Sequence, residues 1–109
     1  MISSVISTAA SGMAAQQKRM EAIASNVANV DTPDYRRKEV DMVSTGPGVR
    51  AVVSEGPAEQ GVDLATEIVD LIDTKMAYEA NIAVMETGMD MWDALMSALA
   101  PEDRDDRWR

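Results

Sequence analysis

The 109-residue sequence contains no cysteine, no histidine and no phenylalanine, and aromatic residues make up only 4% of it. Without cysteine and histidine the chain has no disulfide, no thiol nucleophile, no zinc site of the usual kind and no histidine acid–base catalyst. It also lacks a glycine-rich phosphate-binding loop. We therefore predict that the protein is not an enzyme and that it binds no metal or other cofactor.

The sequence also lacks long hydrophobic runs. No stretch approaches the roughly 20 apolar residues that span a bilayer, and no basic segment precedes an apolar run near the first residue, as it does in a cleaved secretory signal. We expect neither membrane insertion nor a cleaved signal peptide.

Basic residues are scarce in the second half of the chain. The net charge is −9, and residues 63–109 hold four basic and twelve acidic side chains, against six and seven in residues 1–62. Such an acidic half argues against nucleic acid and anionic membrane surfaces as partners.

Two heptad patterns of mainly apolar residues, one toward each end of the chain, are the strongest positive signal. The first consists of Ile2, Ile6, Ala9, Met13, Gln16, Met20, Ile23, Val27 and Val30. The second consists of Leu64, Ile68, Leu71, Lys75, Tyr78, Ile82, Met85, Met89, Trp92, Met96 and Leu99. This spacing predicts two helices with an apolar stripe each, facing one another. Two helices cannot enclose a deep core, so we expect self-association or a partner.

Capping and turn residues give the boundaries of the predicted elements. A helix over 3–30 begins at Ser3 or Ser4 and ends before Pro33. Short alternating runs in residues 36–60, separated by a turn over 45–48, predict a β-hairpin. Asp63 is a suitable N-cap for a second helix over 64–99.

The predicted fold class is therefore mainly α. Long N- and C-terminal helices pack as a coiled-coil-like pair, with a short β-hairpin or extended segment between them. We divide the chain into an N-terminal axial helix with its exit turn (1–33), the extended or hairpin segment (34–61), a C-terminal axial helix (62–100) and a charged tail (101–109).

Four positions inside the two helices leave alternatives open. Gly12 is either a point of close helix contact or a tolerated surface glycine, and Gly88 is a candidate soft point. Gln16 and Lys75 interrupt the two apolar patterns. Each either fixes register, as polar residues in coiled coils do, or points past the edge of the stripe.

Charged groups and the tail also allow two interpretations. The run 36–38 is a solvated strand start, or it pairs with the acidic second helix of a neighbouring copy. The pairs Asp70–Asp73 and Asp90–Asp93 lie on helical faces and suit either a bound cation or, by base rates, a solvated acidic face. Trp108 is a docking anchor or a loosely held end residue.

The chain resembles the bacterial flagellar rod and hook family at both ends. Residues 10–20 and 24–36 match its N-terminal signature, whose core is Ser-Gly-X-X-Ala, then Arg, then Asn-X-Ala-Asn-X-X-Thr-Pro-X-Tyr. The C-terminal signature is matched by Val62-Asp63-Leu64, Glu67-Ile68-Val69, Leu71-Ile72, residues 77–81, Val84 and Thr87. Two departures stand out: Met76 replaces a common arginine, and Asp34 a frequent glycine.

The resemblance implies a structural subunit of the flagellar basal body. Such a subunit polymerises through its terminal helices into the periplasm-spanning rod, the axial drive shaft. Its partners are other rod or axial proteins, itself and the flagellar type III export apparatus, which carries it out without a cleaved signal. The short length points to the proximal rod type. The alternative is a soluble helical adapter or regulatory protein, or a hook-related paralogue, that binds one defined partner.

Candidate site residues follow from the apolar patterns and from the family signature. The predicted assembly interface comprises Ile6, Met13, Met20, Ile23, Val27, Leu64, Ile68, Leu71, Tyr78, Ile82, Met85, Met89 and Trp92. The resemblance implies that the bend between the first helix and the outward segment is shaped by Asn26, Asn29, Thr32, Pro33 and Tyr35. It also implies that Tyr78 and Asn81 serve the contact between the helices.

Overall fold

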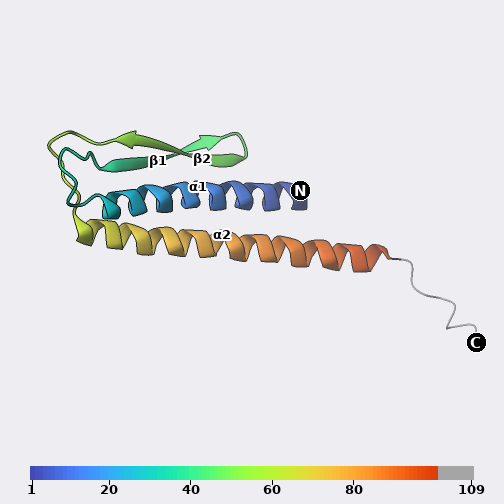
Figure 1. Ribbon diagram of the computed structural model, residues 1–109. Helices are drawn as coiled ribbons and strands as arrows, with labels where there is room; N and C mark the ends of the chain where they lie inside the picture. Colours follow the sequence, from blue (N-terminus) through green and yellow to red (C-terminus); the bar gives the residue numbers. More distant parts are fainter. Residues whose placement is uncertain (101–109) are drawn as a thin grey trace, which may run out of the picture.

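The structure, a computed structural model, describes residues 1–100 and consists of two long helices and one hairpin (Figure 1). Helix α1 spans Ile2–Ala28, strands β1 and β2 span Lys38–Thr45 and Gly48–Glu55, and helix α2 spans Leu64–Leu99. The predicted mainly α fold, with two packed helices joined by a hairpin, is thereby confirmed. The predicted tail over 101–109, with Trp108, lies outside the described residues. Neither helix is both long and apolar enough to cross a membrane.

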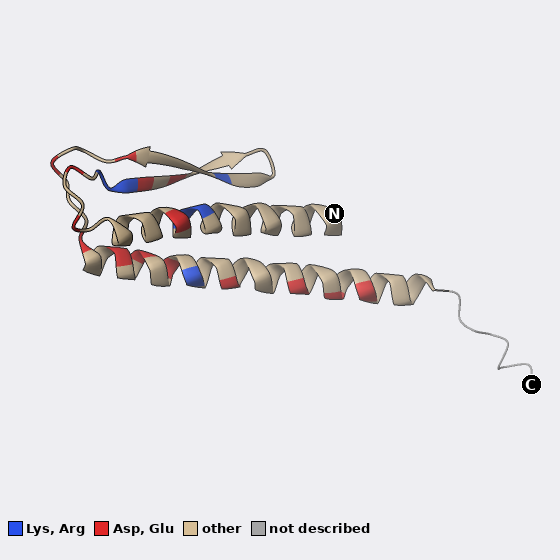
Figure 2. Ribbon diagram, in the orientation of Figure 1, with Lys and Arg blue, Asp and Glu red and all other residues tan. Residues whose placement is uncertain are grey.

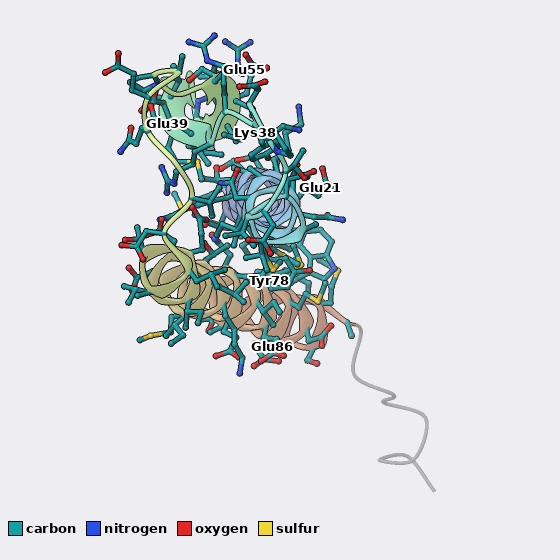
Figure 3. The ribbon with its side chains drawn as sticks, turned by 60° about the vertical axis from the view of Figure 1, so that its left-hand side comes forward. Glu21, Lys38, Glu39, Glu55, Tyr78 and Glu86 are labelled. Atoms are coloured by element: carbon teal, nitrogen blue, oxygen red, sulfur yellow. The ribbon has the colours of Figure 1, made fainter. Side chains whose placement is uncertain are left out.

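The elements form three layers, with α1 in the middle. The hairpin runs along one side of α1, and α2 runs antiparallel along the other (Figure 1). Within the described residues, both strands contact α1 and neither contacts α2. Figure 3 shows the same stacking, with Lys38, Glu39 and Glu55 on the hairpin side and Glu86 on the side of α2 that faces away from α1. Helix α1 is therefore covered on two sides. In the part of the chain that the structure describes, helix α2 is covered only on the side that faces α1.

The helix ends follow local backbone chemistry, with one correction at the start of α1. Met1 is the N-cap, with no side-chain hydrogen bond, and the Ser4 hydroxyl donates back to the Met1 carbonyl at 2.9 Å. The predicted serine cap is therefore wrong. At α2 the predicted cap is confirmed, because the Asp63 carboxylate accepts from the backbone N–H of Ala65 at 3.1 Å. That bond satisfies one of the unpaired N–H groups of the first helical turn.

The hairpin is a regular antiparallel pair that α1 holds at its tip. Eight residues pair on each strand, from Lys38 with Glu55 to Thr45 with Gly48. Two residues connect the strands, and Gly46 adopts a φ of 58°, which favours glycine. The Thr8 hydroxyl donates to the Pro47 carbonyl at 2.9 Å. Because an isolated hairpin is marginal in water, this bond and the burial of Ala51 stabilise it against α1.

Few apolar side chains are buried within the single chain. The buried apolar residues are Ala9, Ala15, Ala22, Ile23 and Ala51, of which four are alanine. The largest fully buried side chains are polar and belong to Asn26, Glu67 and Thr74. Most large apolar residues of α2 are exposed. The small apolar core expected for two helices is therefore present, and it gives limited stabilisation because burial energy scales with apolar area.

Asp34, in the turn after α1, is the one non-glycine residue of the described chain with a positive φ, at 62°. This left-handed backbone costs a residue with a Cβ roughly 1–2 kcal/mol, less for Asp. Glycine avoids that cost, but its greater conformational freedom stabilises the unfolded state by about 0.5–1 kcal/mol. We expect Asp34→Gly to raise the free energy of unfolding by about 0.5 kcal/mol, measured by urea titration. The matched change Asp31→Gly, in the same turn, should lower it, and equal effects of the two changes would contradict this explanation.

Candidate functional site

Helix α2 meets α1 along a polar and small-residue face. Its buried residues are Glu67, Thr74 and Gly88. Each lies one position before a member of the predicted apolar pattern, which corresponds to a turn of about 100° at these positions. In the middle of α2 the pattern residues Tyr78, Ile82 and Met85 are still half-buried. The expectation that the two apolar patterns face one another is correct for much of α1 and wrong for much of α2. The reason is that the side of α1 that faces α2 carries a glycine, Gly12, and a buried amide, Asn26. These residues pack against Asn81 and Glu67 of α2.

Two glycines permit the close approach of the helices. A Cβ added to Gly12 would lie 2.5 Å from Oδ1 of Asn81, and one added to Gly88 would lie 3.0 Å from Cγ1 of Ile6. Both distances are shorter than ordinary van der Waals contact. Gly12 is thus a point of close helix contact, as one of the two interpretations holds. Gly88 is a packing position against Ile6 within a continuous helix.

The predicted assembly residues divide into two sets by their exposure. Seven lie buried or half-buried: Ile6, Met13, Met20, Ile23, Tyr78, Ile82 and Met85. Figure 3 places Tyr78 at the junction of α1 and α2. Six are exposed: Val27, Leu64, Ile68, Leu71, Met89 and Trp92. Within one chain the first set is thus at least partly covered, whereas the second set is not.

The two polar interruptions of the patterns have different positions. Gln16 is half-buried, and its Oε1 atom is buried without a hydrogen-bond partner among the described residues. Lys75 points past the edge of the contact, since its side chain is 73% exposed and lies 3.9 Å from Glu79. Only Gln16 therefore occupies a position from which a polar group can affect the register of the helices.

A buried amide connects α1, the exit turn and the hairpin. Asn26 is 1% exposed and makes four hydrogen bonds. Its Oδ1 accepts from the Lys38 backbone N–H at 2.8 Å and from the Tyr35 hydroxyl at 3.0 Å. Its Nδ2 donates to the Lys38 carbonyl at 3.0 Å and to Oε1 of Glu67 at 3.3 Å. With both amide atoms fully used, Asn26 fixes where the chain leaves α1 and where β1 begins.

An ion-pair cluster adjoins this amide and joins the hairpin base to α2. Arg37 donates from Nε to Glu67 Oε1 at 2.5 Å and from Nη2 to Asp70 Oδ2 at 3.1 Å. Glu67 is 0% exposed and the Arg37 side chain 17%. Arg19 of α1 approaches the other Asp70 oxygen at 3.6 Å. The interpretation of the basic run as a solvated strand start is therefore wrong for Arg37, whereas Arg36 forms an exposed pair with Glu55.

Burial would lower the pKa of Arg37, but the hydrogen bond to Glu67 and the nearby charges of Glu67, Asp70 and Glu39 outweigh it and raise the pKa. The guanidinium therefore stays charged over the accessible pH range. Among residues 1–100, no group of three or more acidic side chains is arranged to hold a metal ion. Asp70, a candidate cation ligand in the sequence, is instead paired with two arginines.

The residues that the family signature assigns to the bend lie together at the end of α1. Asn29 ends the helix, and its Nδ2 donates to the Ser25 carbonyl at 2.8 Å. The Thr32 hydroxyl donates to Asn29 Oδ1 at 3.0 Å. Tyr35 reaches back to Ser25 and Asn26, and Pro33 is exposed. Sequence reasoning missed Arg37, Glu67 and Asp70 at this site. The only signal for Glu67 was its place in the C-terminal signature.

Comparisons with known proteins agree with this arrangement. A family model described as flagella basal body rod protein matches residues 6–36, which cover most of α1 and the exit turn. A second, described as flagellar basal body rod FlgEFG protein C-terminal, matches residues 59–98, which cover nearly all of α2. A comparison with curated protein sequences gives no match. The two matches fall on the two packed helices, in the family's order, and the chain therefore belongs to the bacterial flagellar basal-body rod and hook family of structural, axial proteins.

Proposed function

We propose that this chain polymerises through α1 and α2 into the helical tube of the flagellar rod and so forms part of the axial drive shaft. The observation that carries the proposal is the exposed apolar surface of α2. Ile72 is 53% and Met76 62% exposed, and similar residues occur along the full length of the helix. These residues lie on several faces of α2, beside a charged stripe that includes Lys75, Glu86 and Asp90. Monomeric proteins rarely leave so many large apolar side chains of one helix exposed.

The internal packing of the chain supports the same proposal. The fully buried residues of α2 are small or polar, while most of its large apolar residues remain exposed. Each such side chain stabilises an assembly by about 1.5–3 kcal/mol when a neighbour buries it. In this proposal residues 1–33 and 62–100 form the assembly part, residues 34–61 project outward, and the bend residues hold the two parts in place. The single short hairpin between the helices favours the proximal rod type.

The proposal includes the route and the partners of the protein. The chain reaches the periplasm-spanning rod through the flagellar type III export apparatus without a cleaved signal, and its neighbours are copies of itself and other axial proteins. It has no catalytic role. These statements are supported by the family to which the chain belongs and not by a contact in the structure.

A double variant tests the assembly surface. We expect Ile72→Asp with Met76→Asp to abolish polymerisation, because two charges replace two apolar contacts that together contribute roughly 3–6 kcal/mol. The isolated chain should keep its helical content, since both side chains are already exposed. Sedimentation over rising protein concentration and the presence of the chain in purified basal bodies provide the measurements.

The matched control is Val52→Asp, which places the same charge on an exposed residue of the hairpin, away from α2. This variant should assemble normally. If it blocks assembly as strongly as the double variant, the terminal helices are not the assembly surface. A wild-type chain that remains a finite monomer or dimer and is absent from basal bodies would instead favour the adapter alternative.

A further inference from the structure

A shallow groove lies between the first turns of α1 and the second half of α2. It consists of two adjoining hollows of about 250 and 360 Å³ that share Val5 and Val84. The other lining residues are mostly small, and they include Ala83, Gly88 and Ala9. No charged side chain lines either hollow. The groove is therefore an uncharged, largely apolar depression suited to large apolar side chains.

The end of α2 extends beyond α1 and has no cover within the described chain. Gly88 is the last buried residue of the helix, where it packs against Ile6 near the start of α1. Residues 89–99 are all exposed and extend for about 16 Å. Figure 1 shows this overhang past the N-terminal end of α1. Its large apolar residues are Met89, Met91, Trp92, Leu95, Met96 and Leu99.

We propose that the overhang of one copy, residues 89–99, seats in the groove of a second copy. Apart from Met91, which also belongs to the overhang, the groove is lined by small and medium-sized side chains, and the overhang supplies large ones, so the two surfaces complement each other in size. Their charges are also compatible. The overhang carries Asp90 and Asp93, and the half of α1 beside the groove has no charged side chain to repel them (Figure 2). This inference rests on the proposed function, because it names the contact between polymerising copies.

For two copies that lie parallel, the positions of the two surfaces give the offset of the contact. On α2 the groove runs from Asn81 to Met91, so its centre lies near residue 86, whereas the centre of the overhang lies near residue 94. Two parallel copies in this contact are offset by about 12 Å along the helix axis. Because the two surfaces differ, each copy still has a free groove or overhang after binding. Such a heterologous contact continues into an open filament.

Cysteine cross-linking tests the contact, because the natural chain contains no cysteine. One copy carries Val84→Cys in the groove, and another carries Met96→Cys in the overhang. The two are mixed in equal amounts under mild oxidation. A disulfide needs Cβ atoms about 3.5–4.5 Å apart. Docking holds the two thiols at millimolar effective concentration, so at micromolar protein the heterodimer should exceed both homodimers by about tenfold.

Controls separate the possible outcomes. Val52→Cys, on the exposed face of the hairpin, replaces Met96→Cys and should give no excess of heterodimer. Thr87→Cys, an exposed groove residue, replaces Val84→Cys if the latter variant loses helical content. Each copy holds one cysteine, so occupation of the groove by its own chain gives no heterodimer and overturns the inference. A predominance of homodimers also overturns it.

The outcome for the proposed function is measured independently by sedimentation of the wild-type chain. If the wild type polymerises but the Val84→Cys and Met96→Cys copies do not cross-link, the groove contact is wrong and the rod function stands. If the wild type stays monomeric at high concentration and is absent from basal bodies, the rod function is wrong and this contact falls with it.

Discussion

Replacing Arg37 with methionine is expected to lower the free energy of unfolding by about 3–5 kcal/mol. The change leaves Glu67 fully buried without its ionic partner, and the other Glu67 oxygen already has no hydrogen-bond partner among the described residues. A buried carboxylate without a counter-charge is costly because the protein interior solvates it poorly. Circular dichroism during urea titration measures the loss. A loss of this size is a large fraction of the stability of a small domain.

The neighbouring arginine supplies the matched control. Arg36 pairs with Glu55 at 3.7 Å, and both side chains are largely exposed. Arg36→Met should therefore cost no more than about 1 kcal/mol. The double change Arg37→Met with Glu67→Met should recover much of the loss, because apolar residues can replace a buried ion pair without leaving a charge behind. Equal effects of the two single arginine changes would show that burial of the Arg37–Glu67 pair is unimportant.

Replacing Asn26 with alanine is expected to lower the free energy of unfolding by about 2–4 kcal/mol. The change leaves the Lys38 N–H and carbonyl, the Tyr35 hydroxyl and Glu67 without a bond that each makes to this amide. Unsatisfied buried polar groups cost more than the net value of the hydrogen bonds themselves. Urea titration gives the total loss, and amide hydrogen exchange at Lys38 reports whether the hairpin base opens first.

Asn29 provides the comparison for this change, since it belongs to the same turn but is only half-buried. Its amide donates to the Ser25 carbonyl within the last turn of α1. Asn29→Ala should cost about 0.5–1.5 kcal/mol and leave exchange at Lys38 unchanged. If the two asparagine changes have the same effect on Lys38, the junction does not depend on the buried amide.

The described chain thus buries several polar side chains and leaves many large apolar side chains exposed, and this combination has consequences for assembly. Directional hydrogen bonds and ion pairs among Asn26, Arg37, Glu67 and Asp70 hold the elements of one chain in a single arrangement. The large apolar side chains remain available for neighbours. Under the proposed function, a subunit built in this way is marginally stable alone and gains further apolar burial on polymerisation, which favours ordered assembly over independent folding.

Local features of the sequence were sufficient for the elements and the family. Heptad spacing predicted both helices, alternation around a Gly-Pro turn predicted the hairpin, and Asp63 marked the start of α2. The two terminal signatures identified the family. Each of these features involves residues close in sequence, where backbone geometry alone determines the outcome.

The orientation of α2 and the partners of the charged residues were decided by the tertiary structure. Because the large apolar residues of α2 lie on several of its faces, periodicity does not determine which face meets α1. The small residues of α1 and the attraction between Arg37 and Glu67 select the polar face. The tertiary structure also decides that Arg37 and not Arg36 pairs with Glu67, and that Gly12 and Gly88 lie at close helix contacts. Their roles depend on the shape and charge of a segment more than twenty residues away, which a local pattern does not contain.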